Sequence, residues 1–239
     1  MDTTPNRLQS TASQRGGSAC FSRGKPVPVP RFTERLEFEN VEKHRTFLES
    51  FSQDERYGSH LFPLLLAALV TNGPILEMGA GEHSTRTLNR LSALQARQVV
   101  TAESAEDWLE RFAHLGTHSF NGAAWSAVGE RRLWSVVLID HSPGPRRVED
   151  LKRFACRAEL VVLHDTEARH AAFYRYGSGI AEYRHRLRYR RFPAETMLLS
   201  NFFDLAPFVD VLGKGVTTLL GPRKPHRTRT SKRRLKVMK

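Results

Sequence analysis

Cysteine is scarce in this sequence. Cys20 and Cys156 are the two cysteines among 239 residues, and they lie far apart with no metal-ligand spacing. This argues against a disulfide framework and a cysteine zinc site, and in favour of a reducing compartment. We therefore expect an intracellular protein, cytoplasmic or nuclear, with Cys156 as an ordinary core residue.

A long apolar run is also missing. A membrane-spanning helix needs about 20 apolar residues, whereas the longest candidate here, residues 61–70, contains Pro63. The N-terminal stretch lacks the apolar region of a secretory signal. Its Arg and Ser content suits an organelle transit peptide, but Asp2 and the lack of a clear amphipathic helix argue against one, so organelle targeting stays open. These features exclude an integral membrane protein and favour one soluble domain.

Acidic residues are absent from the C-terminal end. The net charge is +12, and residues 222–239 hold nine Lys or Arg with no acid, while residues 1–31 hold five against Asp2. Both ends have too little apolar surface to bury a core, so we expect disordered basic segments at 1–31 and 222–239 around a nearly neutral domain at 32–221. The basic tail would bind nucleic acid or another polyanion, serve in nuclear targeting, or have no specific role.

The most informative segment covers residues 74–88. An apolar run of strand length meets Glu77, then a turn with Gly79 and Gly81, and then Ser84 and Thr85 at the start of a helical pattern. Glycines allow a tight turn and a close approach of the backbone to a ligand, while Ser84 or Thr85 can cap the helix. The pattern predicts a nucleotide-type cofactor loop in which Glu77 suits a cationic ligand group; the alternative is a plain structural turn.

A second acidic residue ends the apolar segment at residues 98–103. Glu103 lies about 20 residues beyond the glycine loop, where an acid commonly accepts the ribose hydroxyls of a cofactor. Ser104 follows it. The alternative is that Ser104 caps a helix together with Asp107 and that Trp108 is a core residue.

Two further apolar runs end in an Asp and His pair. Residues 134–141 end in Asp140 and His141, and residues 160–165 end in His164 and Asp165. Such runs are typical of parallel strands buried on both faces, whose carboxyl ends form ligand sites. Either histidine could remove a proton from an accepting hydroxyl, or it could orient a neighbouring side chain instead.

These motifs resemble those of class I S-adenosylmethionine-dependent methyltransferases, over about residues 57–205. The Glu-x-Gly-x-Gly-x-x-Ser-Thr form is similar to the branch of catechol-type and sugar O-methyltransferases, the type 24 family. The resemblance implies a Rossmann-like doubly wound α/β sheet, mostly parallel, with a C-terminal antiparallel hairpin and helices on both faces. It also implies S-adenosylmethionine as cofactor and O-methyl transfer to a small-molecule or sugar hydroxyl. The implied cofactor-binding residues are Glu77, Gly79, Gly81, Ser84, Thr85, Glu103, Ser104 and Asp140.

The same resemblance makes Asp140 and Asp165 candidate ligands of a divalent metal such as Mg²⁺. This chain departs from the catechol-type pattern, because Thr166 replaces an amide ligand and residues 142–147 stand where the lysine base is expected. Metal binding is therefore in doubt, and the base stays unassigned among Asp140, His141, His164 and Asp165.

The remaining pattern predicts leading helices at residues 41–51 and 61–70 and a strand near 118–120. Residues 183–190 alternate arginines with Tyr, His and Leu, and together with residues 195–200 they predict a terminal hairpin whose arginine row protects a sheet edge. The alternative is a basic, tyrosine-interleaved surface that holds an anionic substrate or nucleic acid.

Two other functions compete with methyl transfer. A nucleic-acid-binding protein would use the fold as a scaffold and the tail for affinity, with or without RNA methylation. A nicotinamide-dependent oxidoreductase is disfavoured, because Ser84 stands where the third glycine of a dehydrogenase loop is usual.

Overall fold

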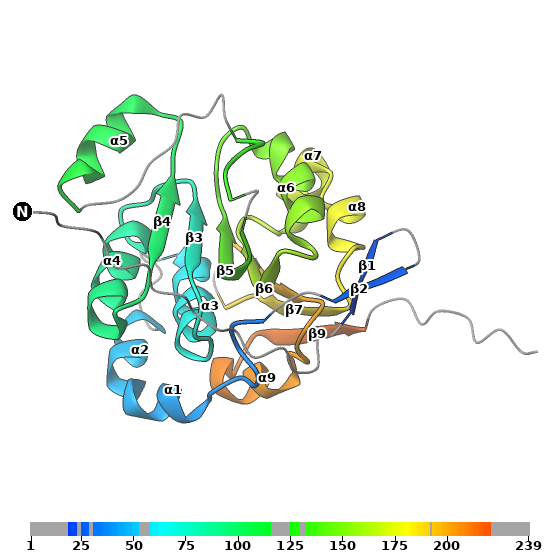
Figure 1. Ribbon diagram of the computed structural model, residues 1–239, viewed down its shortest axis with the longest axis horizontal. Helices are drawn as coiled ribbons and strands as arrows, with labels where there is room; N and C mark the ends of the chain where they lie inside the picture. The colour runs from blue at the N-terminus through cyan, green and yellow to red at the C-terminus, as the bar shows by residue number, and fades with distance from the viewer. Residues whose placement is uncertain are drawn as a thin grey trace, which may run out of the picture.

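The centre of the molecule is a seven-stranded sheet with the order β4-β3-β5-β6-β8-β7-β9 (Figure 1). The computed structural model describes residues 19–22, 25–28, 31–52, 58–115, 125–129, 132–191 and 193–220. The strand expected near residues 118–120 and the basic tail at 222–239 lie outside these ranges. Among the described residues no helix is both long and apolar enough to span a bilayer.

Four neighbouring strands of this sheet run parallel, and all are almost fully buried. Their apolar residues alternate between two separate cores, so that Ile75 packs on one face of the sheet and Leu76 on the other. This explains the near-continuous apolar runs, since both faces are covered. The strands are β3 (Ile75–Met78), β4 (Val99–Ala102), β5 (Trp134–Ile139) and β6 (Ala158–Leu163).

The C-terminal hairpin is confirmed as β7 (His185–Tyr189) and β8 (Thr196–Ser200). Strand β8 is antiparallel to both β6 and β7, so β7 runs in the same direction as β6. The expected arginine-protected edge is wrong, because β9 (Val216–Leu220) pairs with β7 and covers it. Strand β9 is not among the expected elements, although its Thr and Val residues suit a strand.

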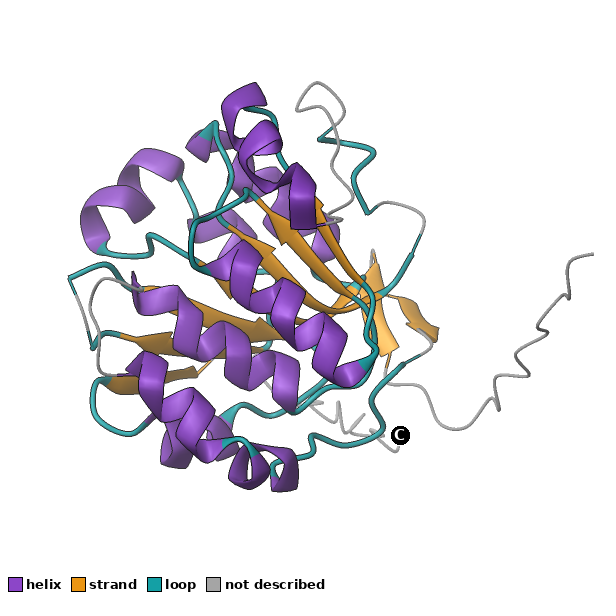
Figure 2. Cartoon of the chain, turned by 90° about the vertical axis from the view of Figure 1, so that its left-hand side faces the viewer, coloured by secondary structure: helices purple, strands orange, loops and turns teal. Residues whose placement is uncertain are grey.

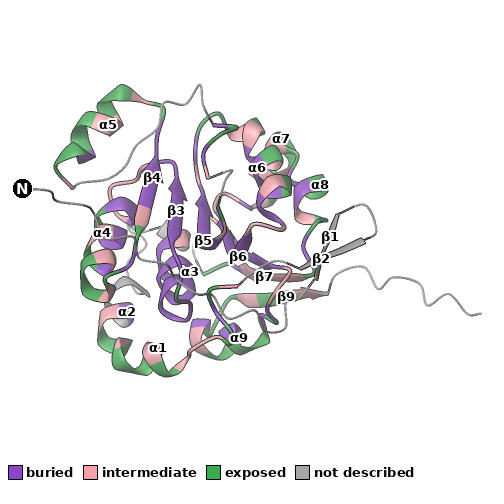
Figure 3. Ribbon diagram, viewed as in Figure 1, coloured by how far each residue is buried: buried purple, intermediate pink, exposed green. Residues whose placement is uncertain are grey.

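Helices cover both faces of the sheet (Figure 2). Burial is concentrated in the strands and in the helix sides that face them (Figure 3). One core contains residues of α3, α4 and α9, and the other contains residues of α6 and α8. The two expected leading helices are confirmed. The one expected at residues 41–51 corresponds to α1 followed by α2, and the one expected at residues 61–70 corresponds to α3. The helices are α1 (Glu39–Lys43), α2 (Arg45–Ser52), α3 (Gly58–Leu69), α4 (Ser84–Gln95), α5 (Glu106–Phe112), α6 (Arg147–Phe154), α7 (Ala168–Tyr174), α8 (Gly177–Ile180) and α9 (Ala206–Leu212).

A separate two-stranded antiparallel pair precedes the domain. It consists of β1 (Ala19–Ser22) and β2 (Lys25–Pro28). Cys156, which follows α6, takes part in a disulfide bond. The expectation that Cys156 is an ordinary core residue is therefore wrong, and so is the argument against disulfide bonding, because distance along the sequence says little about distance in the folded chain.

Candidate active site

The loop between β3 and α4 packs directly against the end of β5. Gly79 has φ +95°, and a Cβ at this position would lie 2.6 Å from the backbone oxygen of Asp140. A side chain at position 79 would therefore be strained, and it would also collide with the backbone at the end of β5. A Cβ at Gly81 would meet only the hydroxyl oxygen of Ser84, at 2.7 Å. Gly79 thus brings the cofactor-type loop and Asp140 to the same edge of the sheet.

The hydroxyl of Thr85, at the start of α4, closes the loop rather than capping the helix. His83 occupies the N-cap position without a side-chain cap bond, so the expected cap by Ser84 or Thr85 is not seen. Instead, the backbone N–H of Gly81 donates to Oγ1 of Thr85 at 2.9 Å. Ser84 and Thr85 are both buried, so neither hydroxyl is exposed at the surface of the loop.

Glu77 is fully buried beneath this loop. Its Oε2 accepts a hydrogen bond from the hydroxyl of Thr101 at 2.7 Å. Burial raises the pKa of Glu77 to about 7, although the nearby hydroxyls of Ser84 and Thr101 oppose that shift. Its Oε1 has no hydrogen-bond partner among the described residues. A positive charge held in the loop would favour the ionised carboxylate, as expected for a cationic ligand group.

Glu103 lies beside the glycine loop, as its position in the sequence predicts. Its carboxylate accepts hydrogen bonds from the backbone N–H groups of Ala80, at 2.8 Å, and Ala105, at 2.9 Å, and from that of Ser104. The hydroxyl of Ser104 also lies 3.4 Å from Oε1. Oε2 accepts only the N–H of Ala80 among the described residues, so this oxygen can still accept from a ligand hydroxyl. Ala105 is the N-cap of α5 and makes no side-chain cap bond, so the alternative cap by Ser104 is not seen.

A small hollow adjoins Glu103. Trp108 and Phe112, whose rings stack at 5.7 Å, form one wall of it. Its volume is only about 10 Å³, far less than a nucleoside requires. Helix α5 extends outward from the end of β4 (Figure 1), so an outward shift of α5 would widen the hollow.

Asp140 and Asp165 share one arginine. Nη2 of Arg147 lies 3.1 Å from Oδ1 of Asp140, and Nη1 lies 3.1 Å from Oδ2 of Asp165. The Nε–H of Arg147 donates to the carbonyl oxygen of His141 at 2.7 Å. Asp165 has φ +56°, a conformation that Asp tolerates better than most residues. The two predicted metal ligands are therefore close together, but with a guanidinium group between them.

His164 joins the same cluster. Its Nδ1 lies 3.2 Å from Oδ1 of Asp140 and 3.4 Å from Oδ1 of Asp165. Burial lowers the pKa of His164, but the hydrogen bond and charge of Asp140, together with the charge of Asp165, more than offset this, and the pKa lies above its usual value. Its Nε2 has no hydrogen-bond partner in the described part of the chain. An imidazole oriented by a carboxylate at Nδ1 leaves Nε2 to exchange a proton.

His60, in the first turn of α3, is a member of the cluster that our sequence analysis missed. Its ring centroid lies 4.4 Å from that of His164. Burial, followed by the charge of His164, lowers the pKa of His60 to about 3, so this ring is neutral at physiological pH. A histidine in the first turn of an apolar helix gives no signal in the sequence that it faces a strand end about 80 residues away.

Two groups of side chains could hold a metal ion. Potential ligand atoms of His60, Asp140 and His164 all lie within 4.8 Å of one another, as do those of a second group, Asp165, Glu167 and His170.

His141 points elsewhere. Its Nε2 lies 2.9 Å from Oδ2 of Asp150 on α6, and its ring stacks on Trp125 at 4.6 Å between centroids. Both His141 and Asp150 are buried. Of the two histidines that end apolar runs, the structure therefore brings only His164 to the carboxylate cluster.

We expect His141→Ala to destabilise the protein without removing its chemistry. The change leaves a cavity beside Trp125 and removes a partner of the buried Asp150, so the free energy of unfolding should fall by about 2–4 kcal/mol. Urea unfolding checks this. A large loss of turnover at unchanged stability would contradict this structural role of His141.

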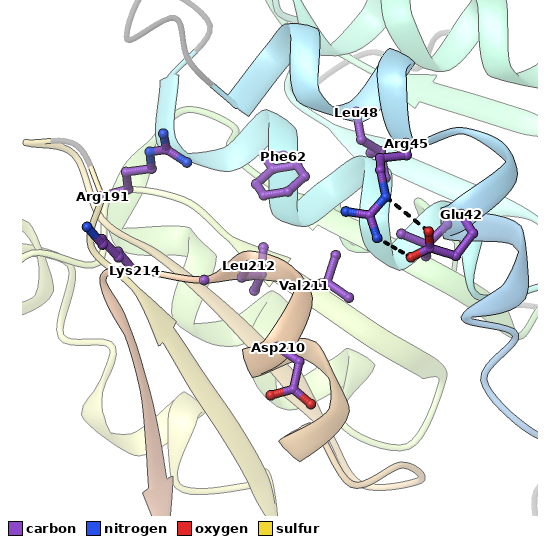
Figure 4. Close-up of a pocket in the computed structure, with 11 residues that line it drawn as sticks. Glu42, Arg45, Leu48, Phe62, Arg191, Asp210, Val211, Leu212 and Lys214 are labelled. Carbon is purple, nitrogen blue, oxygen red and sulfur yellow. Dashed lines mark hydrogen bonds and ion pairs between the residues drawn. The ribbon is translucent and has the colours of Figure 1, made fainter.

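A larger cavity lies between the leading helices and α9 (Figure 4). Its volume is about 590 Å³, within the range of small-molecule sites. Apolar side chains such as Phe62 and Leu212 meet charged side chains around it, where Arg45 is paired with Glu42. The lining residues are Val41, Glu42, Arg45, Leu48, Phe62, Arg191, Asp210, Val211, Leu212, Gly213 and Lys214.

Comparison with known proteins gives distant structural similarity. No protein-family model and no curated protein matches the sequence. A putative O-methyltransferase from Klebsiella pneumoniae is 17% identical with a TM-score of 0.47, over 70% of this chain and 97% of that one. The SAH-bound methyltransferase PaMTH1 from Podospora anserina is 14% identical with a TM-score of 0.44, over 72% and 91% of the two chains. An O-methyltransferase from Bacillus cereus in complex with SAH is 13% identical with a TM-score of 0.43, over 69% and 91%.

Proposed function

We propose that this protein is an S-adenosylmethionine-dependent methyltransferase that methylates a hydroxyl oxygen of a small molecule or sugar. The observation that carries this proposal is the packing of Gly79 against the backbone of Asp140. It places a nucleotide-type loop beside a carboxylate and histidine pair at the carboxyl ends of parallel strands. Ligand sites of open α/β sheets lie at such ends.

The residues around the loop have the chemistry that the cofactor needs, although the hollow beside Glu103 would have to widen to admit its nucleoside. Glu103 retains acceptor capacity for ribose hydroxyls, and the unpartnered Oε1 of the buried Glu77 favours a nearby positive charge. Gly79 and Gly81, with Ser84 and Thr85 beneath them, shape the loop. When bound, S-adenosylmethionine would supply the methyl group to be transferred.

His164 is our candidate for the base that takes the proton of the acceptor hydroxyl. Asp140 and Asp165 hold Nδ1, which fixes the ring orientation. Nε2 is buried and has no partner among the described residues, so the acceptor hydroxyl would have to enter beside it. The charged partners of Asp140 lower its pKa, despite its burial, so that it stays ionised next to the imidazole. His60 is neutral and borders His164. Part of the rate would come from alignment of the acceptor with the methyl group, because displacement depends strongly on position.

Calorimetry with S-adenosylmethionine and with NAD tests this function. We expect the full chain to bind S-adenosylmethionine and not NAD, because Ser84 replaces the third glycine of a dehydrogenase loop. Binding should justify a screen of hydroxyl acceptors for methyl transfer. Binding of NAD alone would favour an oxidoreductase, and binding of neither by folded protein would leave a scaffold function.

A further inference from the structure

Two carboxylates at neighbouring strand ends require a positive charge close to them. Asp140 follows β5 and Asp165 follows β6, and their side chains are only 23% and 20% exposed. Carboxylates that share a partly buried site repel each other, and one of them takes up a proton unless a cation compensates. The question is whether the protein or a bound ion supplies this cation.

Arg147 supplies it from the first residue of α6. Its guanidinium group contacts Asp140 and Asp165 at 3.1 Å each, and its Nε–H donates to the carbonyl oxygen of His141. Nη1 also lies 3.4 Å from the hydroxyl of Tyr176, and the group lies over the ring of Tyr174 at 5.2 Å. The side chain is 6% exposed. All three nitrogens have partners, which fixes the guanidinium group in the planar geometry that carboxylates favour.

A divalent ion does not fit between these two carboxylates. Mg²⁺ needs oxygen ligands at about 2.0–2.1 Å in octahedral geometry, and the guanidinium group occupies the space that Asp140 and Asp165 both face. An ion bound to either carboxylate there would also lie against a buried positive charge. Mg²⁺ would therefore have to displace the side chain of Arg147 from all its contacts.

We propose that Arg147 is a built-in cation that takes the place of a divalent metal at this site. It neutralises Asp140 and Asp165 and holds them against His164, so that methyl transfer proceeds without a metal ion between them. Arg147 is thus a positioning residue. Its role in transfer rests on the proposed function, whereas its effect on metal binding does not.

The test is a calorimetric titration of Mg²⁺ into wild-type protein, Arg147→Ala and Arg146→Ala. We expect Arg147→Ala to bind Mg²⁺ about 100-fold or more tightly than wild type, because the competing charge is gone. Arg146→Ala is the matched control, since it removes the neighbouring arginine, which lies near Asp150. The double variant Arg147→Ala/Asp165→Asn should lose the acquired site. Destabilisation alone would not create a metal site, so this gain separates the proposed role from general damage to the fold.

Wild-type binding of Mg²⁺ that both Asp140→Asn and Asp165→Asn remove would overturn the proposal, whereas binding that depends on Asp165 alone would report on the group with Glu167 and His170. Failure of folded Arg147→Ala to gain the site would do the same, with circular dichroism used to establish folding. Arg147→Met, which keeps more of the apolar packing, provides a second variant. If neither variant folds, the wild-type titration still decides, because absence of a site that depends on both Asp140 and Asp165 is the expected result there. Calorimetry with S-adenosylmethionine tests the proposed function independently.

Discussion

His164→Ala is expected to lower kcat by about 10²- to 10⁴-fold, the usual contribution of a positioned general base. Affinity for S-adenosylmethionine should change little, because the cofactor loop contacts Asp140 through its backbone rather than through the imidazole of His164. Steady-state turnover with an identified acceptor, together with calorimetry, separates the two effects.

The matched control for this variant is His185→Ala. His185 begins β7, which runs in the same direction as β6. It therefore lies at the amino ends of these strands, whereas His164 lies at the carboxyl end of β6. Its side chain is near Asp204, at 3.7 Å, and its removal should leave kcat nearly unchanged. A similar loss of kcat in both variants, or turnover retained by His164→Ala, would contradict the assignment of the base.

The pH profile gives a second measure of the same role. His164 accepts a proton only when neutral, so kcat/KM should fall as pH decreases through its pKa, which Asp140 and Asp165 raise above the usual value. Asp140→Asn removes one of these charges and should move the acidic limb to lower pH, since the imidazolium form loses support. An acidic limb that stays in place in Asp140→Asn would argue that another group controls the profile.

Glu103→Ala should produce the second large effect, a loss of about 100-fold or more in affinity for S-adenosylmethionine. A hydrogen bond to a charged group contributes about 1.5–3 kcal/mol, and the ribose offers two hydroxyls to this carboxylate. The variant also removes the acceptor for the N–H of Ala80, so the loop itself loses a contact. Calorimetry on folded protein measures the loss.

Two further variants define what Glu103 contributes. Glu103→Gln keeps the shape and one carbonyl acceptor, so its affinity should lie between those of wild type and Glu103→Ala. Glu106→Ala removes an exposed acid in the first turn of α5 and should bind normally. Normal binding by Glu103→Ala would place the ribose elsewhere.

Apolar patterning made the sheet predictable. Residues 134–139 and 158–163 form strands buried on both faces, as near-continuous Val, Ile and Leu indicate. The alternation at residues 185–189 identified β7, because Leu187 and Tyr189 face the core while arginines lie between them. The edge assignment failed because β9 pairs with β7, and such a pairing joins segments that local pattern cannot connect.

At the candidate site, residue type and neighbours along the chain did not predict which contacts each side chain makes. Ser84 and Thr85 suit helix caps by type, yet Thr85 bonds to Gly81, because the tight loop brings that N–H to its hydroxyl. His141 and His164 both adjoin an Asp in sequence, but successive residues at a strand end point in different directions. His141 therefore reaches Asp150 and Trp125, while His164 reaches Asp140.

The sequence by itself determined the strand runs, the glycine loop and the acids at the strand ends, since these depend on periodicity and on neighbours along the chain. Only the tertiary structure decided that Arg147 lies between Asp140 and Asp165 and that His60 faces His164. Those contacts depend on the packing of α6 and α3 against the sheet and on the direction of each side chain. A charge is visible in a sequence, whereas the charge that it neutralises is fixed only when distant segments pack together.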